Sequence, residues 1–255
     1  MKERMKSTME WTTTSAGKEK TAFIKEKIQE LGLTVSERQA EQFGLYYELL
    51  VQWNSFMNLT AITEFEEVVQ KHFVDSLSII QVINPEDVDN LMDVGTGAGF
   101  PGIPLKIMYP HLNVTLLDSL KKRIDFLQEV IGRLKLEGIE AIHGRAEDYA
   151  KKGRKREQYD LCVSRAVANL STLSEYCLPY VKIGGAFVPY KSGEIEKELE
   201  KAKSAVFLLG GKTEVCKTFV LPGTDIGRSL LCIRKVNGCP QKYPRKSGMP
   251  AKEPL

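Results

Sequence analysis

Residues 91–104 read Leu-Met-Asp-Val-Gly-Thr-Gly-Ala-Gly-Phe-Pro-Gly-Ile-Pro, and they carry the strongest structural signal in the chain. Its apolar start predicts a buried strand that ends at Val94, and its end predicts that a helix opens at about residue 102. Between them stand Gly95, Gly97 and Gly99. Because glycine has no Cβ, the backbone can turn sharply at these positions and approach a ligand closely. The stretch therefore predicts a strand, a glycine turn and a helix beside a tightly bound small molecule.

The spacing of the glycines leaves two cofactors open. Read from Gly97 to Gly102, the run matches the dinucleotide fingerprint, which is a weak signal by itself. Read from Asp93, an acidic residue is followed by three alternating glycines, a form typical of S-adenosylmethionine sites. We favour the second register because its first glycine follows the strand directly, where the chain must turn. Asp93 is then placed to hold the methionyl ammonium, directly or through backbone amides. A turn without a ligand would not need three alternating glycines.

Acidic residues also follow the next predicted strands. The strand expected over residues 113–118 ends in Asp118, about 20 residues after the first glycine, where a ribose diol needs an acceptor. Ser119 is predicted to cap the helix that follows. After a third strand over 139–143, Ala146 and Glu147 are placed to face an adenine. From the residues alone, a solvated helix start is an equally good interpretation of Glu147. A fourth strand is expected over 159–163.

The order of the predicted elements indicates the fold class. The last two strands, expected over 214–221 and 229–235, are joined by a turn that permits only an antiparallel hairpin. The prediction is an α/β protein with a mostly parallel, seven-stranded sheet that ends in this hairpin, together with an N-terminal helical cap. This is the plan of the class I S-adenosylmethionine-dependent methyltransferases, which have a Rossmann-like fold. A dinucleotide dehydrogenase would need a second parallel half, for which too little chain remains.

The chain of 255 residues is long enough for one domain with an appendage. We expect four parts: a disordered extension over residues 1–20, the helical cap over 21–85, the methyltransferase domain over 86–238 and a basic C-terminal tail over 239–255. In the cap, the sequence Ser36-Glu-Arg-Gln39 is a helix-capping box. A second cap helix, expected over 66–82, carries Lys71, His72 and Asp75.

Composition excludes several classes of protein. Five widely spaced cysteines with no Cys-x-x-Cys pair predict a reducing compartment, and three scattered histidines predict no metal site. The sequence has no apolar stretch of roughly 18 residues that could span a membrane, and its beginning has no hydrophobic segment. We therefore expect a cytoplasmic protein without membrane contact. The net charge of +3 is too small to indicate nucleic acid by itself.

Several motifs in the same order as in a known family carry a resemblance that runs from about residue 21 to the end. They are Asp93 to Pro104, Leu117-Asp-Ser119, Lys122-Arg123, Arg145-Ala-Glu147, Ser164-Arg-Ala166 and Lys242-Tyr-Pro-Arg-Lys246. Together they resemble the bacterial small-subunit rRNA guanine-N7 methyltransferase G family, also called glucose-inhibited division protein B. The resemblance implies methyl transfer from S-adenosylmethionine to N7 of a guanine in the decoding-region loop of 16S rRNA. It also implies cofactor contacts at Gly95, Phe100, Ala146, Glu147 and Arg165.

This chemistry agrees with what the sequence contains. Guanine N7 carries a lone pair and no proton, so its attack on a sulfonium methyl is an in-line displacement that needs no general base. Alignment and desolvation then supply the catalysis. An unpaired cation near the reacting atoms would oppose the step. We therefore expect Arg165 to be paired with a carboxylate or phosphate and to act as a positioning residue between the cofactor and the substrate.

Basic clusters predict how RNA is bound. The predicted contacts are Lys122, Arg123, Arg145, Lys191, Arg245 and Lys246, with a further basic loop over residues 151–156. The expected partner is 16S rRNA, the small ribosomal subunit or its precursor, bound by a monomer. Two alternatives stay open: a ribosome-assembly factor that binds S-adenosylmethionine and RNA without turnover, and a methyltransferase that acts on a protein or metabolite.

Overall fold

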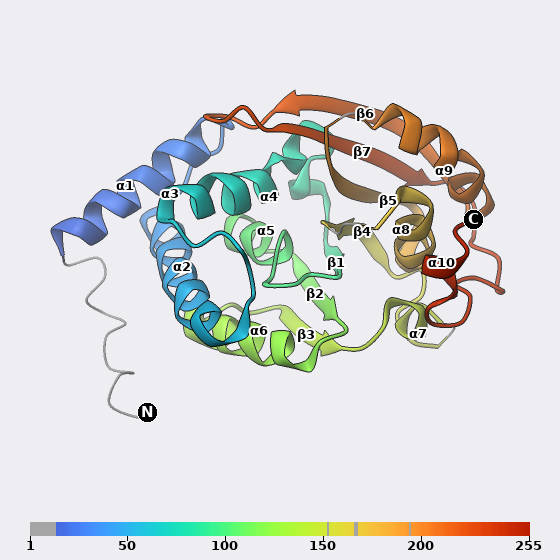
Figure 1. The fold of residues 1–255 in the computed structure, drawn as a ribbon, viewed down its shortest axis with the longest axis horizontal. Coiled ribbons are helices and arrows are strands. Elements are labelled where there is room, and N and C mark those ends of the chain that lie inside the picture. Colours follow the sequence, from blue (N-terminus) through green and yellow to red (C-terminus); the bar gives the residue numbers. More distant parts are fainter. Residues whose placement is uncertain (1–13, 152, 166–167, 194) are drawn as a thin grey trace.

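A seven-stranded sheet forms the centre of the computed structural model, which describes residues 14–151, 153–165, 168–193 and 195–255 (Figure 1). The strand order is β3-β2-β1-β4-β5-β7-β6. Only β7 runs against its neighbours, β5 and β6; the other strand pairs are parallel. The predicted fold class is confirmed. The strands are β1 (Asn90–Val94), β2 (Asn113–Asp118), β3 (Ile139–His143), β4 (Tyr159–Ser164), β5 (Val181–Ser192), β6 (Gly211–Val220) and β7 (Gly227–Lys235).

Helices cover both faces of the sheet because the central strands are apolar on both sides. Successive residues such as Leu91 and Met92 belong to different hydrophobic clusters, one on each face. The cluster of Leu91 includes α5 (Gly102–Met108) and α6 (Lys121–Leu134), and that of Met92 includes α8 (Leu170–Cys177) and α9 (Glu196–Leu208). The result is a three-layer sandwich whose polar loops gather at the carboxyl ends of the strands, where open α/β sheets bind their ligands.

The N-terminal cap packs on the side of the sheet covered by α5 and α6. It consists of α1 (Ser15–Gln29), α2 (Glu37–Met57), α3 (Phe65–Val68), the π-helical turn η2 (Val69–Val74), α4 (Asp75–Leu77) and the 3₁₀ turns η3 (Ser78–Gln81) and η4 (Pro85–Asp87). The predicted capping box at Ser36 is present. Buried residues of α2, including Phe43 and Tyr46, join the same hydrophobic core as Leu91. The cap and the sheet therefore share one core.

Two local predictions are wrong. Residues 14–20, expected in a disordered extension, form the N-cap and the first turns of α1, because the Thr14 side chain caps the helix and Ile24 and Ile28 bury its apolar stripe. The rest of the expected extension, residues 1–13, lies outside the described residues. Ser119 does not cap α6, whose N-cap position is Leu120. Instead, the Asp118 carboxylate accepts a hydrogen bond from the Leu120 amide.

No described helix is long and apolar enough to cross a membrane.

The segment after β7 packs against the helices that follow β3 and β4. It contains the short helix α10 (Met249–Lys252), which contacts α8. Arg156, near the end of the loop before β4, donates to the carbonyl oxygens of Cys239, Pro240 and Tyr243. Figure 1 shows this segment beside α7 (Ala146–Tyr149) and α8. Residues 239–255 are thus part of the folded structure.

Candidate functional site

The turn after β1 has the conformation that its glycines permit. Gly95, Gly97 and Gly99 have φ values of +71°, +62° and +99°, which side chains with a Cβ rarely adopt. The amides of Gly95 and Thr96 donate to the Leu117 carbonyl at 2.9 and 3.2 Å, so the turn is fixed to the end of β2. The Gly97 amide donates to the Asp118 carboxylate at 2.9 Å. The glycine loop and Asp118 therefore form one rigid unit.

Asp93 lies fully buried beneath this loop. Its Oδ2 accepts hydrogen bonds from the Thr96 hydroxyl at 2.7 Å and from the Gly102 amide at 2.9 Å, at the start of α5. Its Oδ1 is buried and has no hydrogen-bond partner among the described residues. Burial raises the pKa of Asp93 to about 6. Since the carboxylate is covered, the predicted direct contact with a ligand is not available to it, and the alternative of acting through the backbone of the loop remains.

A cavity of about 300 Å³ opens beside the glycine loop, and we call it the glycine-loop cavity. Of the predicted cofactor residues, Gly95, Asp118, Ala146 and Glu147 line it. It is also lined by Val94, Leu117, Ser119, Arg123, Gly144, Arg145, Ser164, Ala168, Leu173 and Tyr176.

The lining fits a nucleoside that carries a positive charge. Leu117, Leu173 and Tyr176 supply apolar surface, and the buried carboxylates of Asp118 and Glu147 supply acceptors. Asp118 already accepts from the Gly97 and Leu120 amides and from Arg123, which leaves about one of its four acceptor positions. The partnerless Asp93 oxygen under the loop adds an uncompensated acceptor that a cation bound nearby would stabilise. The cavity thus matches the donor pattern of S-adenosylmethionine.

Three predicted cofactor residues lie behind the cavity rather than on its wall. The Phe100 ring stacks on His72, with ring centres 4.5 Å apart, and packs against Tyr46. Phe100 and Gly99 are buried, and neither they nor Gly97 line the glycine-loop cavity. The contact implied for Phe100 is therefore not reflected in the lining of this cavity. Its ring instead joins the loop to the cap through Tyr46 and His72, and the Tyr46 hydroxyl also donates to the Ala98 carbonyl of the loop.

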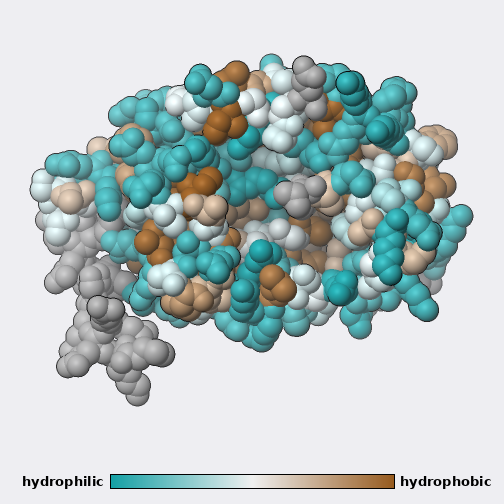
Figure 2. All heavy atoms as spheres, viewed as in Figure 1, coloured by the Kyte–Doolittle hydropathy of each residue, from teal (hydrophilic) through white to brown (hydrophobic). Residues whose placement is uncertain are grey.

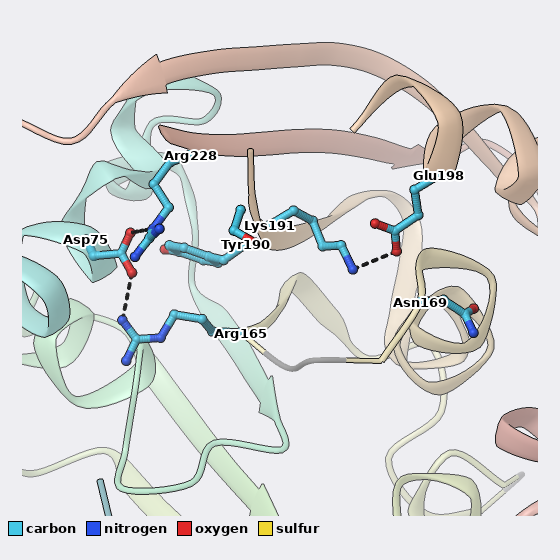
Figure 3. Close-up of a pocket in the computed structure, with 8 residues that line it drawn as sticks. Asp75, Arg165, Asn169, Tyr190, Lys191, Glu198 and Arg228 are labelled. Atoms are coloured by element: carbon cyan, nitrogen blue, oxygen red, sulfur yellow. Dashed lines mark hydrogen bonds and ion pairs between the residues drawn. The ribbon is translucent and has the colours of Figure 1, made fainter. Parts of the chain in front are cut away.

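A second cavity, of about 500 Å³, lies at the ends of β4 and β5 (Figure 3), and we call it the arginine cavity. Arg165 lines this cavity, and the preceding residue, Ser164, lines the glycine-loop cavity. Adjacent residues at the end of β4 therefore line the two cavities. The lining consists of Asp75, Arg165, Asn169, Tyr190, Lys191, Ser192, Glu198 and Arg228.

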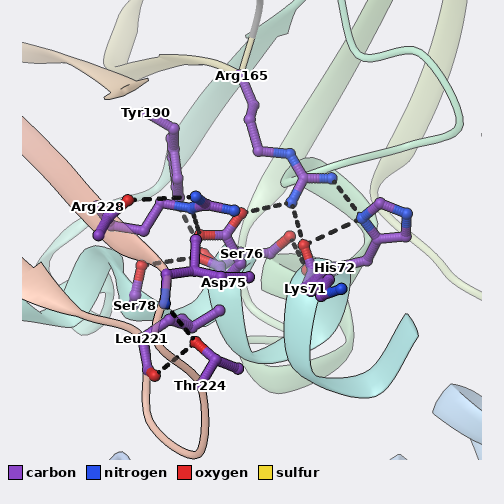
Figure 4. Close-up of polar contacts among 12 residues, drawn as sticks. Lys71, His72, Asp75, Ser76, Ser78, Arg165, Tyr190, Leu221, Thr224 and Arg228 are labelled. Carbon is purple, nitrogen blue, oxygen red and sulfur yellow. Dashed lines mark hydrogen bonds and ion pairs between the residues drawn. The ribbon is translucent and has the colours of Figure 1, made fainter. Parts of the chain in front are cut away.

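Arg165 is paired with a carboxylate, as expected from the charge argument. Its Nη1 donates to Asp75 Oδ2 at 2.9 Å, and the other oxygen of Asp75 accepts from Arg228 Nε at 2.8 Å. Figure 4 shows the two guanidinium groups on either side of the buried Asp75. Arg165 also donates to the Lys71 carbonyl and lies 5.0 Å above the centre of the Phe100 ring. Buried charge pairs with this many hydrogen bonds hold their side chains in one orientation.

His72 completes the network and is neutral. Burial, and after it the Arg165 charge, lowers the pKa of His72 to about 3. The ring contacts the Thr60 hydroxyl through Nε2 and Arg165 through Nδ1. None of the network residues His72, Asp75, Tyr190 and Arg228 is among the site residues predicted from the sequence. The signal available in the sequence was the close spacing of Lys71, His72 and Asp75 on one predicted helix.

The structure divides the predicted RNA-binding residues into two groups. Lys122, Arg145 and Lys246 are exposed, and Arg145 and Lys246 have no ion-pair partner in the described part of the chain. Lys122 reaches the Met57 carbonyl at 3.3 Å. The other three are paired: Arg123 with Asp118 at 3.1 Å, Lys191 with Glu198 at 2.7 Å and Arg245 with Glu175 at 2.6 Å.

These ion pairs give some of the predicted contacts a structural role. Arg245 binds the buried carboxylate of Glu175 through two nitrogens and so fixes the C-terminal segment to α8. In the loop over 151–156, Lys155 pairs with Glu140, while Arg156 binds the carbonyls already described. Lys152 lies outside the described residues. Among the side chains that are described, no cluster of three or more His, Cys, Asp or Glu could hold a metal ion.

Figure 2 shows that hydrophilic residues predominate on the face seen in Figure 1, with hydrophobic residues only in scattered patches. Such a surface is suited to a charged partner more than to an apolar one.

Comparison with known proteins places the chain in a family. The sequence model described as rRNA small subunit methyltransferase G matches residues 39–226, which include both cavities except Arg228. A protein named ribosomal RNA small subunit methyltransferase G from Lachnoclostridium phytofermentans is 59% identical over 228 residues, covering 89% of this chain and 94% of that protein. One of the same name from Alkaliphilus metalliredigens is 49% identical over 237 residues, covering 93% of this chain and 99% of that protein.

Among solved structures, that of M. jannaschii TYW2 in complex with AdoMet has a TM-score of 0.53 at 15% identity, covering 66% of this chain and 77% of that one. At this identity the likeness establishes the methyltransferase fold only. The sequence matches go further, because they extend over most of both chains. This chain therefore belongs to the rRNA small subunit methyltransferase G family.

Proposed function

We propose that this protein transfers a methyl group from S-adenosylmethionine to N7 of a guanine in 16S rRNA, namely guanine 527 of the decoding-region loop. Membership of the family supports the reaction class and the rRNA acceptor. The guanine and its N7 atom come from the resemblance of the motifs. We further propose that the protein works in the cytoplasm, where small subunits are made.

The observation that carries this proposal is that adjacent residues at the end of β4 line the two cavities. Ser164 lines the glycine-loop cavity and Arg165 lines the arginine cavity, so a donor in the first and an acceptor base in the second would both lie beside this strand end. The arginine cavity, at about 500 Å³, is within the range of cavities that bind small organic molecules. A base turned out of an RNA loop is such a ligand.

The chain has residues suited to hold the cofactor. The Gly95 backbone, Asp118, Ala146 and Glu147 would hold S-adenosylmethionine, with Asp93 supporting the loop from below. When bound there, the cofactor supplies a methyl group activated by a sulfonium. Apolar residues on the wall, Leu117 and Leu173, would exclude water from the region around it.

No residue of the arginine cavity has to move a proton. Guanine N7 has no proton to lose, so a neutral His72 and a Tyr190 whose pKa is raised by burial are compatible with the reaction. Tyr190 donates its hydroxyl proton to the Ser76 carbonyl at 2.6 Å and so serves as a fixed wall. Arg165 can orient an acceptor base, and the Asp75 carboxylate, which it shares with Arg228, offsets part of the charge that would oppose the positive charge developing on the purine.

The test is to incubate the protein with methyl-labelled S-adenosylmethionine and small subunits, or 16S rRNA, from cells that lack this activity. Chemical cleavage at N7-methylguanine then maps the label. We expect a single cleavage at the guanine in the decoding-region loop. Label on another atom or another nucleotide would overturn the acceptor assignment. Tight cofactor binding with no label on any RNA substrate would favour the non-catalytic assembly factor.

A further inference from the structure

The two walls of the arginine cavity differ in how their charged side chains are paired. On one wall, Arg165 and Arg228 are both held by Asp75, whose two oxygens are thereby used. The facing wall carries Lys191, at the end of β5, and Glu198, in the first turns of α9. Figure 3 shows Lys191 and Glu198 pointing toward each other across from the arginines. Neither Lys191 nor Glu198 has a role in the methyl transfer as proposed above.

Only one of the two carboxylate oxygens of Glu198 accepts hydrogen bonds from other described residues. Its Oε1 accepts from Lys191 Nζ at 2.7 Å and from the Leu170 amide at 2.6 Å. Lys191 is fixed in turn, because its Nζ also donates to the Ala168 carbonyl at 2.9 Å and its side chain is only 10% exposed. Glu198 Oε2 has no hydrogen-bond partner in the described residues, and the side chain is 30% exposed. A carboxylate oriented by one oxygen therefore has acceptor positions open toward the cavity.

We propose that Glu198 selects guanine as the acceptor base, by accepting hydrogen bonds from the N1–H and the N2 amino group on the Watson–Crick edge, with Lys191 as the positioning residue that orients it. This proposal rests on the proposed function. Guanine presents two adjacent donors on that edge, whereas adenine presents an acceptor at N1, which a carboxylate repels. N7 lies on a different edge of the purine, so this contact leaves its lone pair free. Unlike the arginines, Glu198 has the charge that guanine's donors require.

The competing explanation is that Glu198 acts only through its neighbours. Its bonds to Lys191 and to the start of α8 would then fix the cavity wall, and any substitution would slow methylation of every acceptor alike. The two roles differ in one respect. Only a direct contact makes the effect of the substitution depend on whether the base has its N2 amino group.

The test combines a change in the enzyme with a change in the base. Small subunits are reconstituted with 16S rRNA that carries either guanine or inosine, which lacks the N2 amino group, at the accepting position. Single-turnover methylation by the wild-type protein should be at least about tenfold slower on inosine, as expected for losing a hydrogen bond to a charged group. Glu198→Gln should be slower than wild type on guanine and should methylate the two bases at rates within about threefold. Any intrinsic difference in N7 reactivity affects both enzymes and cancels in the comparison.

The matched control is Glu200→Gln, the same change two residues along α9, where the side chain is 70% exposed and pairs with Lys203. It should keep the wild-type preference for guanine.

Cofactor affinity and the thermal midpoint of Glu198→Gln show whether the variant is folded. If it is not, the wild-type comparison still decides, because equal rates on guanine and inosine would overturn the proposal. A Glu198→Gln variant that is slower by the same factor on both bases would also overturn it. Failure of the wild-type protein to methylate the guanine at all would instead refute the proposed function, and this inference with it.

Discussion

Arg165 lies beside the proposed acceptor site, and the Asp75 carboxylate that it shares with Arg228 offsets part of the positive charge there. We expect Arg165→Ala to lower the single-turnover rate of rRNA methylation by about 100-fold, the scale of a small misplacement of reacting groups. Cofactor affinity should change little, because Arg165 does not line the glycine-loop cavity. The measurement pairs single-turnover kinetics with calorimetric titration of S-adenosylmethionine.

Arg133→Ala is the control for this variant, since Arg133 lies on α6 and pairs with Glu129 at 3.6 Å, away from both cavities. It should methylate at the wild-type rate. Methyl transfer at the normal rate by Arg165→Ala would show that Arg165 has no positioning role.

Asp93 gives a prediction about pH and stability. Burial raises the pKa of this carboxyl from its ordinary 3.8 to about 6, so the folded state binds the proton more tightly than the unfolded state does. The cost of ionising it is absent at low pH, grows as the pH rises through about 4 to 6, and reaches about 3 kcal/mol above that range. Asp93→Asn cannot ionise. The free energy of unfolding of Asp93→Asn, minus that of wild type, should therefore increase by up to about 3 kcal/mol as the pH rises from 4 to 7.

Urea unfolding at several pH values measures this difference. Asp225→Asn, the same change at an exposed position in the turn before β7, is the control and should follow the wild-type curve. Parallel curves for Asp93→Asn and wild type would mean that Asp93 is not the source of a pH-dependent cost.

At the scale of elements, the glycine loop packs tightly against the cap helix α2 at Gly99. A Cβ added there would lie 2.5 Å from Ile103 Cδ1 and 2.7 Å from the Tyr46 hydroxyl, at a φ of +99°. We expect Gly99→Ala to lower the free energy of unfolding by about 2–4 kcal/mol, through strain and overpacking. Gly132→Ala, in the exposed part of α6 with nothing within 4 Å, should raise it by about 0.5–1 kcal/mol. Denaturant unfolding of both variants checks the pair; equal effects would contradict the packing argument.

The C-terminal segment depends on one buried ion pair. Arg245→Met would leave the Glu175 carboxylate buried without its partner, and we expect a loss of about 3 kcal/mol of unfolding free energy. Lys246→Met, at the exposed neighbouring position, should change stability by less than about 0.5 kcal/mol. Adding Glu175→Leu to Arg245→Met should restore most of the loss, because it removes the uncompensated charge. A double variant no more stable than Arg245→Met would argue against this cause.

The strands of the sheet could be predicted because each is a short apolar run with a turn at its end, as in residues 113–118 and 139–143, which match β2 and β3. Periodicity says nothing about partners on distant parts of the chain. The sequence therefore could not reveal that Arg245 binds Glu175, 70 residues away, or that Asp75 joins Arg165 to Arg228. The same limit explains Phe100, whose apolar side chain fits a cofactor wall and a core equally well until Tyr46 and His72 are placed beside it.

At the scale of the whole molecule, net charge is a poor guide to RNA binding, because pairing removes much of the basic surface. Lys191, Arg123 and Arg245 are held by carboxylates, whereas Lys122, Arg145 and Lys246 remain exposed. If RNA phosphates lie on the exposed group, their binding should release counterions in proportion to the number of contacts. The paired cations should contribute little to this effect.

Replacing Lys122, Arg145 and Lys246 together by glutamine should therefore make RNA binding less dependent on salt. For single-stranded RNA each lost phosphate contact lowers the slope of log affinity against log salt by about 0.7, so the triple variant should lose about 2 from the slope. The control replaces three exposed lysines that line neither cavity, Lys135, Lys212 and Lys217, and makes the same change in net charge. Fluorescence titrations of an RNA fragment at several salt concentrations give both slopes. If the slope of the control falls as far as that of the triple variant, overall charge, rather than this surface, attracts the RNA.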